Sequence, residues 1–424
     1  MPPDAPAPLL TKFDDVLGRR VIDTHIWAVR EGLRGAAGDA LFDGYCQRLV
    51  ADDVRLWRAQ AAMETLHPQW SGYGYTWRRD LNAIQPLQFE HDDGDDPMWV
   101  RSPFFELIRR AHDGEAEPTL RRRLQEGPEQ RDFAILEEFF AMGATDYFCQ
   151  LHMFGEEGDR SHGSGVVYSF ASDGSDGFSD DDLTLIGATL PALSLAMKAD
   201  AGHVIASSLL AAYLGADAGR RVHAGAVKRG SASSIRAALW YADIRGFTAA
   251  SDAAPGAIIV DLLNDVFETL TGPLRARGGQ VLKFIGDALL ATFSLEEGEV
   301  AETCRRALDA ADEAARALDA LSVARAAAGL PVVAVDIALH VGDVLYGNVG
   351  ATDRLDFTVI GPAVNEVTRI EALCEPLGRR VLVSAEFVAA MKGDERLDSL
   401  GRHALRGVRE AKEIFALPGE LREA

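Results

Sequence analysis

Two aspartates stand at the ends of predicted strands in the second half of the chain, where a carboxylate can reach a bound cation. Asp243 ends the apolar segment 237–243, and Asp287 follows Gly286 at the turn of a predicted hairpin over 281–293. If this strand and the hairpin are neighbours, the two carboxylates can hold two divalent cations for an in-line attack on a phosphoryl group. Taken singly, each aspartate is better explained as a turn residue, so it is their shared placement that indicates this chemistry.

A lysine, an amide and a guanidinium occupy further positions that suit a nucleotide. Lys283 is expected on the same strand face as Val281, where a buried ammonium needs a ligand or a carboxylate. Asn365 and Arg369 are four residues apart, which places them on one face of a helix predicted from about 364 to 375. Such a pair suits a ribose and the phosphate charge that develops during transfer. A surface pair on an amphipathic helix is the open alternative.

The elements that must position these residues follow a regular order from about residue 237. The segments with strand or helix patterns are a strand at 237–243, a helix at 255–277, a hairpin at 281–293, an alanine-rich helix at 299–328, and strands at 332–339 and 356–360. This β-α-β-β-α-β order predicts a ferredoxin-like core and an α+β fold class.

Four segments in this order resemble the catalytic domains of class III adenylate and guanylate cyclases. They are ALWYADIRGFTAAS at 238–251, VLKFIGDALLATF at 281–293, ALHVGDVLYGNVG at 338–350 and DFTVIGPAVNEVTRI at 356–370. The resemblance covers about residues 233–424, and the segment 405–417 is similar to the last strand pair of the family. Four motifs in the right order are far more specific than a single glycine-rich loop.

The resemblance implies a role for each matching residue. It implies that two Mg²⁺ or Mn²⁺ ions are bound by Asp243, Asp287 and the carbonyl of Ile244. It also implies substrate contacts: Gly246 and Phe247 with the triphosphate, Lys283 and Thr358 with adenine, and Arg406 with the terminal phosphates. Asn365 then positions the ribose, and Arg369 stabilises charge on the α-phosphate.

The implied reaction is attack of the ribose 3′ hydroxyl of ATP on the α-phosphate, which yields cyclic AMP and pyrophosphate. In this family the metal-binding and base-reading residues come from opposite subunits, so a chain with the complete set is expected to form a homodimer. ATP is favoured over GTP because guanine presents a carbonyl acceptor and an N–H donor to which Lys283 and Thr358 are poorly matched. A guanylate cyclase and a domain that binds nucleotide without turnover are the alternatives. A diguanylate cyclase should show a GGDEF-like turn, whereas the hairpin here reads FIGDAL.

The first half of the chain is expected to sense a signal. We predict a flexible arm at 1–20, an α+β sensor domain at 21–180, a helical stalk that dimerises and transmits the signal at 181–232, and the catalytic domain at 233–424. The end of the sensor segment resembles a GAF domain that leads into its output helix. Ser179 and Asp182 form a capping box at the start of that helix, although a single buried amphipathic helix is the alternative to a coiled coil. Cys149 and His152 fit ordinary core positions better than ligands of a haem or metal.

Composition excludes several classes of partner. The chain has 424 residues and a formal net charge of −22, which argues against nucleic acid or an anionic membrane as the main partner. The sequence has neither a run of 18 apolar residues nor a secretory leader at Met1, so we expect a cytoplasmic protein without a membrane anchor. The four cysteines are far apart, and neither a disulfide framework nor a zinc site is predicted. The input signal is not identified by the sequence.

Overall fold

The computed structural model describes residues 16–81, 83–91, 97–154 and 165–417. The chain divides into two compact units, residues 1–209 and 210–424, and each is considered by itself. Most of the predicted N-terminal arm lies outside the described residues, and residues 16–20 are already helical. Within the described ranges, no helix combines the length and the apolar character that a membrane crossing requires.

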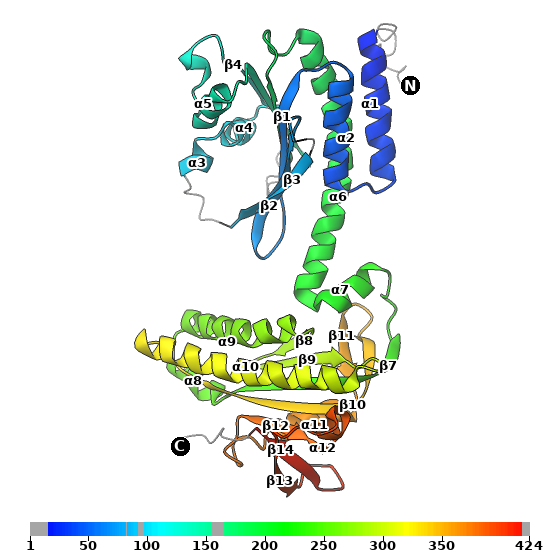
Figure 1. Cartoon of the computed structure of the whole chain (residues 1–424), viewed down its shortest axis with the longest axis vertical. Helices are drawn as coiled ribbons and strands as arrows, with labels where there is room; N and C mark the ends of the chain where they lie inside the picture. The colour runs from blue at the N-terminus through cyan, green and yellow to red at the C-terminus, as the bar shows by residue number, and fades with distance from the viewer. Residues whose placement is uncertain (1–15, 82, 92–96, 155–164, 418–424) are drawn as a thin grey trace. The chain divides into compact units, whose positions relative to one another are not determined.

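The first unit is built on an antiparallel sheet of six strands in the order β3-β2-β1-β6-β5-β4. The strands are β1 (Leu56–Glu64), β2 (Trp70–Arg78), β3 (Ala83–Glu90), β4 (Thr119–Arg123), β5 (Asp146–Met153) and β6 (Gly165–Ser172). The helices are α1 (Val16–Leu33), α2 (Gly38–Ala51), α3 (Pro97–Val100), α4 (Pro103–His112), α5 (Ala134–Ala141) and α6 (Asp180–Leu214). One apolar cluster joins α1, α2 and α6 to the sheet, and a second joins α4 and α5 to it. The helices therefore cover both faces, as Figure 1 shows.

Helix α6 begins at the predicted capping box. The amide of Ser179 donates to Asp182 Oδ2 at 2.9 Å, and the amide of Asp182 donates to Ser179 Oγ at 3.1 Å, which confirms the reciprocal cap. The helix continues through Pro191 to Leu214. Its buried residues, from Leu185 to Ala201, belong to the first unit, so the apolar positions of the expected stalk serve there as core of that unit. Dimerisation through the remaining part stays a prediction.

Cys149 and His152 lie on opposite faces of β5. Cys149 belongs to the cluster that contains α4 and α5, whereas the ring of His152 lies 6.2 Å from the ring of Tyr168 in the other cluster. Residues three apart on a strand alternate in this way. The two side chains therefore cannot bind one ion together, which agrees with the interpretation of both as core residues.

The second unit contains the predicted β-α-β-β-α-β order. It comprises α7 (Ala216–His223), β7 (Ala232–Arg245), α8 (Phe247–Ala253), α9 (Gly256–Ala276), β8 (Gln280–Ile285), β9 (Ala288–Ser294), α10 (Val300–Ala327), β10 (Ala334–Gly350), β11 (Leu355–Ile360), α11 (Pro362–Glu371), β12 (Val381–Ser384), α12 (Ala385–Met391), β13 (Asp398–His403) and β14 (Lys412–Ala416). The sheet order is β13-β14-β12-β10-β7-β9-β8, with β11 paired to β10. The strands β10-β7-β9-β8 give the ferredoxin-like core, so the α+β fold class is confirmed.

Helices cover the two faces of this sheet unequally. Helices α9, α10 and α12 share one large apolar cluster with the sheet, while α11 and α7 pack against the opposite face. Strand β10 continues to Gly350, well beyond the predicted end at 339, because it pairs with β7 from Ala334 to Gly347 and with β11 from Leu345 to Gly350. The segment 405–417 contains only β14, whose partner β13 precedes it, so the expected strand pair begins earlier than predicted. The face covered by α11 carries the polar side chains described next.

Candidate active site

Asp243 and Asp287 are brought together by the register of β7 and β9. The two-residue hairpin turn consists of Gly286 and Asp287, and β9 begins at the next residue, Ala288. Asp243 pairs directly with Ala288. Gly286 has a φ of 63°, a left-handed conformation that glycine adopts readily in such turns. Tyr241, two residues earlier on the same face, donates a hydrogen bond to Asp243 Oδ2 at 3.3 Å. Burial raises the pKa of Asp243, and the nearby charge of Asp287 raises it further.

Two more carboxyl groups surround this pair. Asp336 lies opposite Asp243 on β10 and accepts a hydrogen bond from Arg245 Nε at 2.8 Å. Glu371, at the end of α11, has its pKa raised to about 8, first by burial and then by the charges of Asp243 and Asp336. This region of the site thus has four carboxyl groups and one guanidinium, that of Arg245, which pairs with Asp336. The excess of negative charge favours a bound cation.

The donor set of this edge fits a hard divalent cation. The available side-chain donors are carboxylate oxygens, which Mg²⁺ and Mn²⁺ prefer. No three His, Cys, Asp or Glu side chains in the described ranges are arranged to hold a metal by themselves. Ions held by Asp243 and Asp287 would therefore need further oxygen ligands, such as a backbone carbonyl, water or the phosphates of a substrate.

Lys283 is directed by a β-bulge between β8 and β9. Val281 pairs with Ala291, whereas Lys283 pairs with Leu290, so one extra residue lies between them. Ala291 belongs to the cluster of α9 and α10, and Leu290 belongs to the cluster of α11. Because cross-strand partners share a face, the bulge puts Lys283 on the face opposite to Val281. The prediction that these two residues share a face was therefore wrong.

The partner of Lys283 is a carboxylate on β11. The Lys283 ammonium forms an ion pair with Asp356, and both side chains are about half exposed. Thr358 lies two residues further along β11, on the same strand face as Asp356. The lysine thus has the carboxylate that its position required. The sequence indicated Asp356 only as a neighbour of Thr358 and did not assign it a role.

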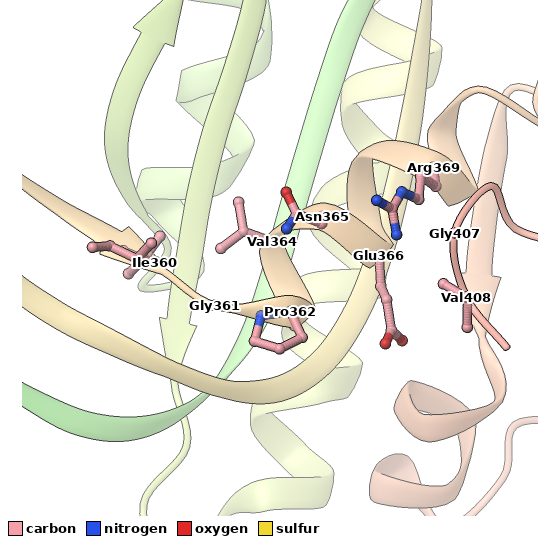
Figure 2. A pocket seen from close by; sticks show the side chains of 10 residues that line it. Ile360, Gly361, Pro362, Val364, Asn365, Glu366, Arg369, Gly407 and Val408 are labelled. Atoms are coloured by element: carbon pink, nitrogen blue, oxygen red, sulfur yellow. The ribbon is translucent and has the colours of Figure 1, made fainter.

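Asn365 and Arg369 line one cavity of about 660 Å³. Asn365 projects from the first turn and Arg369 from the last turn of α11, which begins after Gly361, and Figure 2 shows Arg369 beside the loop that carries Gly407. Within the described part of the chain, neither the Asn365 amide nor the Arg369 guanidinium has a hydrogen-bond or ion-pair partner. An unpaired amide and guanidinium at a cavity are suited to bind a polar anion.

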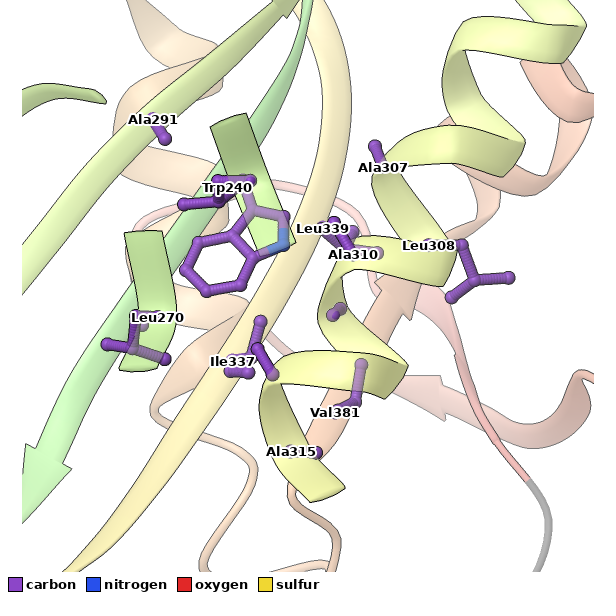
Figure 3. Close-up of a cluster of buried hydrophobic side chains, with 14 of the residues drawn as sticks. Trp240, Leu270, Ala291, Ala307, Leu308, Ala310, Ala315, Ile337, Leu339 and Val381 are labelled. Carbon is purple, nitrogen blue, oxygen red and sulfur yellow. The ribbon is translucent and has the colours of Figure 1, made fainter. Parts of the chain in front are cut away.

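The remaining predicted residues differ in their surroundings. Gly246 has a φ of 68° and precedes α8, and Phe247 packs partly against the cluster of α9 and α10. The side chain of Ile244 is buried in that same cluster, in which Trp240 lies among Leu270, Leu339 and Ala310 (Figure 3). This arrangement leaves only backbone groups of Ile244 for a ligand. Arg406 is exposed and adjoins Gly407, a residue of the cavity.

One chain therefore assembles the predicted residues in three separate groups. They are the carboxylates at the end of β7, the ion pair between β8 and β11, and the cavity at α11. Sequence reasoning missed the carboxyl groups of Asp336 and Glu371. The signal for Asp336 was an acidic residue in an otherwise apolar strand segment, and Glu371 follows Arg369 by two residues.

The second unit matches a known protein family. Residues 231–419 match the adenylate and guanylate cyclase catalytic domain family. The adenylate cyclase of Anabaena cylindrica is 37% identical over 166 residues, which are 38% of this chain and 32% of that protein. Adenylate cyclase 1 of Rhizobium meliloti (strain 1021) is 31% identical over 188 residues, 43% of this chain and 27% of that protein. The chain thus spans about a third or less of these two relatives. The crystal structure of the adenylyl cyclase CyaB from P. aeruginosa superposes with a TM-score of 0.41 at 23% identity, over 46% of this chain and 99% of that chain.

The raised pKa of Glu371 predicts a pH dependence of stability in the absence of metal. The folded state holds this proton up to about pH 8, whereas an ordinary carboxyl group has a pKa of 4.5. The associated stabilisation is fully present below pH 4.5 and is lost as the pH rises through about 8. In urea unfolding with EDTA, the loss of stability of Glu371→Gln between about pH 5.5 and pH 8.5 should be smaller than that of the wild type.

The matched control is Glu375→Gln, which changes an exposed carboxylate one turn further along the chain. This variant should follow the wild-type pH dependence. Equal pH dependence in wild type and Glu371→Gln would show that Glu371 does not hold its proton near neutral pH.

Proposed function

Residues 231–419 are a catalytic domain of the adenylate and guanylate cyclase family, and from this premise we propose that the chain is an adenylate cyclase. It converts ATP to 3′,5′-cyclic AMP and pyrophosphate at sites shared by two copies of the chain. The observation that carries the proposal is the placement of Asp243 beside Asp287, on the sheet face that α11 covers with Asn365 and Arg369. The two relatives from Anabaena cylindrica and Rhizobium meliloti are both adenylate cyclases, which supports the proposal.

In this proposal Asp243 and Asp287 hold two Mg²⁺ or Mn²⁺ ions with the carbonyl of Ile244. When bound, such ions lower the pKa of the ribose 3′ hydroxyl and neutralise charge on the phosphates. The excess of carboxylates at the end of β7 supports this assignment. Burial and then repulsion between carboxylates raise the pKa values of Asp243 and Glu371, and a dication relieves that repulsion. Gly246 and Phe247, at the start of α8, contact the triphosphate.

Asn365 orients the ribose, and Arg369 stabilises the negative charge that develops on the α-phosphate. Both side chains lack a protein partner within the described residues, so they are available to a ligand without first breaking an interaction. Arg406, next to the cavity residue Gly407, reaches the terminal phosphates. Since Asp243 and Asp287 do not line this cavity, a second copy of the chain supplies them. The functional unit is therefore a homodimer with two equivalent sites.

Lys283 and Thr358 read the base. The ammonium donates to N1 of adenine, and the threonine hydroxyl accepts from the amino group. Asp356 holds the ammonium in place through the ion pair between β8 and β11. This arrangement favours ATP over GTP, whose guanine carries a carbonyl and an N–H at the corresponding positions.

The first unit regulates this activity in our proposal. The GAF-like sensor domain predicted at 21–180 already includes α1 from Val16 and α6 as far as Ala201. The rest of the segment 181–232 is the connecting stalk, and the catalytic domain follows at 233–424. The continuity of α6 from the buried core of the first unit to Leu214 supports this arrangement, because one helix can transmit a displacement along its length.

The activity is tested by incubating the purified chain with Mn²⁺ and either ATP or GTP. Cyclic AMP should form faster than cyclic GMP, and Asp287→Asn should lower the rate at least about a hundredfold, since a lost metal ligand removes several kcal/mol of transition-state stabilisation. Asp261→Asn, an exposed change on α9, is the control and should retain full activity. Faster formation of cyclic GMP would identify a guanylate cyclase, and no product from either nucleotide would identify a binding module.

Asp356→Asn tests the role of the ion pair. Loss of the carboxylate leaves the Lys283 ammonium without its partner, so we expect the KM for ATP to rise about tenfold and the preference for ATP over GTP to fall. Asp353→Asn, an exposed change in the preceding turn, should leave both quantities unchanged. An unchanged KM and preference in Asp356→Asn would remove Asp356 from base recognition.

A further inference from the structure

A buried polar cluster lies beneath the cavity of Asn365 and Arg369. His340 on β10 is 3% exposed, and its Nδ1 lies 2.9 Å from the hydroxyl oxygen of Ser384. Its other nitrogen, Nε2, lies 3.6 Å from Glu366 Oε2. Glu366 is on α11, directly after Asn365 and three residues before Arg369.

Two further charged side chains complete the cluster. The Lys412 ammonium on β14 is 3.4 Å from Glu366 Oε2 and also pairs with Glu386 on α12. Glu386 Oε2 lies 3.9 Å from His340 Nδ1. The groups that face the imidazole thus come from α11, β12, α12 and β14. Together with His340 they join α11 to β10, β12, α12 and β14.

Glu366 is the member of this cluster that reaches the cavity. Glu366 is among the residues that line the cavity with Asn365 and Arg369, and its side chain is only 19% exposed. Figure 2 shows this side chain extending away from those of Asn365 and Arg369, and its carboxylate contacts Lys412 and His340. A change in the ion pairing of Glu366 therefore acts on α11, the helix that also carries Asn365 and Arg369.

Apart from this cluster, helix α11 is held to the sheet by apolar packing. It has ten residues, its N-cap Gly361 supplies no side-chain cap, and its buried contacts come from Ala363, Val367 and Ile370. Short helices depend on tertiary contacts for their stability. The Lys412 ammonium, 3.4 Å from Glu366 Oε2, adds a charged contact that ties α11 to β14. Among the described residues this is the ion pair that α11 makes with an ammonium or guanidinium, so Glu366 is suited to set the rotation of the helix.

We propose that Glu366 is a positioning residue, whose carboxylate is held by Lys412 beside the buried ring of His340 so that Asn365 and Arg369 are presented to the substrate phosphates in a fixed orientation. The inference rests on the proposed cyclase function for its catalytic consequence. Its structural part, the fixing of α11, is independent of the reaction. Glu366 itself contributes no group to the chemical step.

The test uses the full chain with Glu366→Gln, which keeps the size of the side chain and removes its charge. We expect kcat to fall about tenfold to a hundredfold, because small displacements of catalytic groups have effects of this size, while the KM for ATP changes less than about twofold. Lys412→Gln should act in the same direction. The double variant should lose less than the product of the two single effects, because both changes break the same pair.

Hydrogen exchange of the backbone amides in 362–371 provides a readout that does not depend on turnover. Protection of these amides should fall in Glu366→Gln relative to wild type. The control is Asp309→Asn, which removes an exposed ion pair of 2.7 Å with Arg396 in the same unit and should change neither kcat nor the protection of α11.

The outcomes separate this inference from the proposed function. If the wild type forms cyclic nucleotide and Glu366→Gln keeps its kcat, the positioning role is wrong and the cyclase function stands. If the wild type forms no product with ATP or GTP, the proposed function fails, and reduced protection of α11 in Glu366→Gln still supports its anchoring. Unchanged protection in Glu366→Gln overturns the inference in either case.

Discussion

Repulsion among carboxylates at the end of β7 is the constraint on which the rest of the second unit depends. The antiparallel register fixes Asp243 next to the hairpin turn of Asp287 and opposite Asp336, and α11 adds Glu371. Arg245 compensates only part of this charge through its ion pair with Asp336. A protein stable at neutral pH keeps such an arrangement at a cost in free energy. In our proposal a pair of divalent cations offsets this cost, and the carboxylates that bind the cations thereby take part in catalysis.

The cationic groups of the site are kept apart from this negative region in one chain. Arg369 lies unpaired at the cavity, although carboxylates are present in the same unit, and Lys283 is engaged by Asp356 instead. If Arg369 were paired with the carboxylates of its own chain, both groups would be unavailable to the substrate. The separation of the groups in one chain is therefore consistent with an active site that is completed by a second copy.

Much of this organisation could be predicted from residue patterns. The Gly286 turn placed the hairpin, the Ser179 cap placed the start of α6, and the order of segments gave the ferredoxin-like core. The β-bulge before Lys283 could not be predicted, because an inserted residue is visible only when two strands are aligned. The role of Glu366 was hidden for a similar reason. Its partners are distant in sequence, and only tertiary packing brings them to α11.

The central claim is that each site combines Asp243 and Asp287 of one subunit with Asn365 and Arg369 of the other. Two inactive variants, Asp287→Asn and Arg369→Ala, can be co-expressed with different affinity tags, and the mixed dimer can be purified through both tags. Shared sites predict that this dimer has one intact site and about half of the wild-type cyclase activity. A mixed dimer as inactive as its parents, or no mixed dimer at all, would contradict the account.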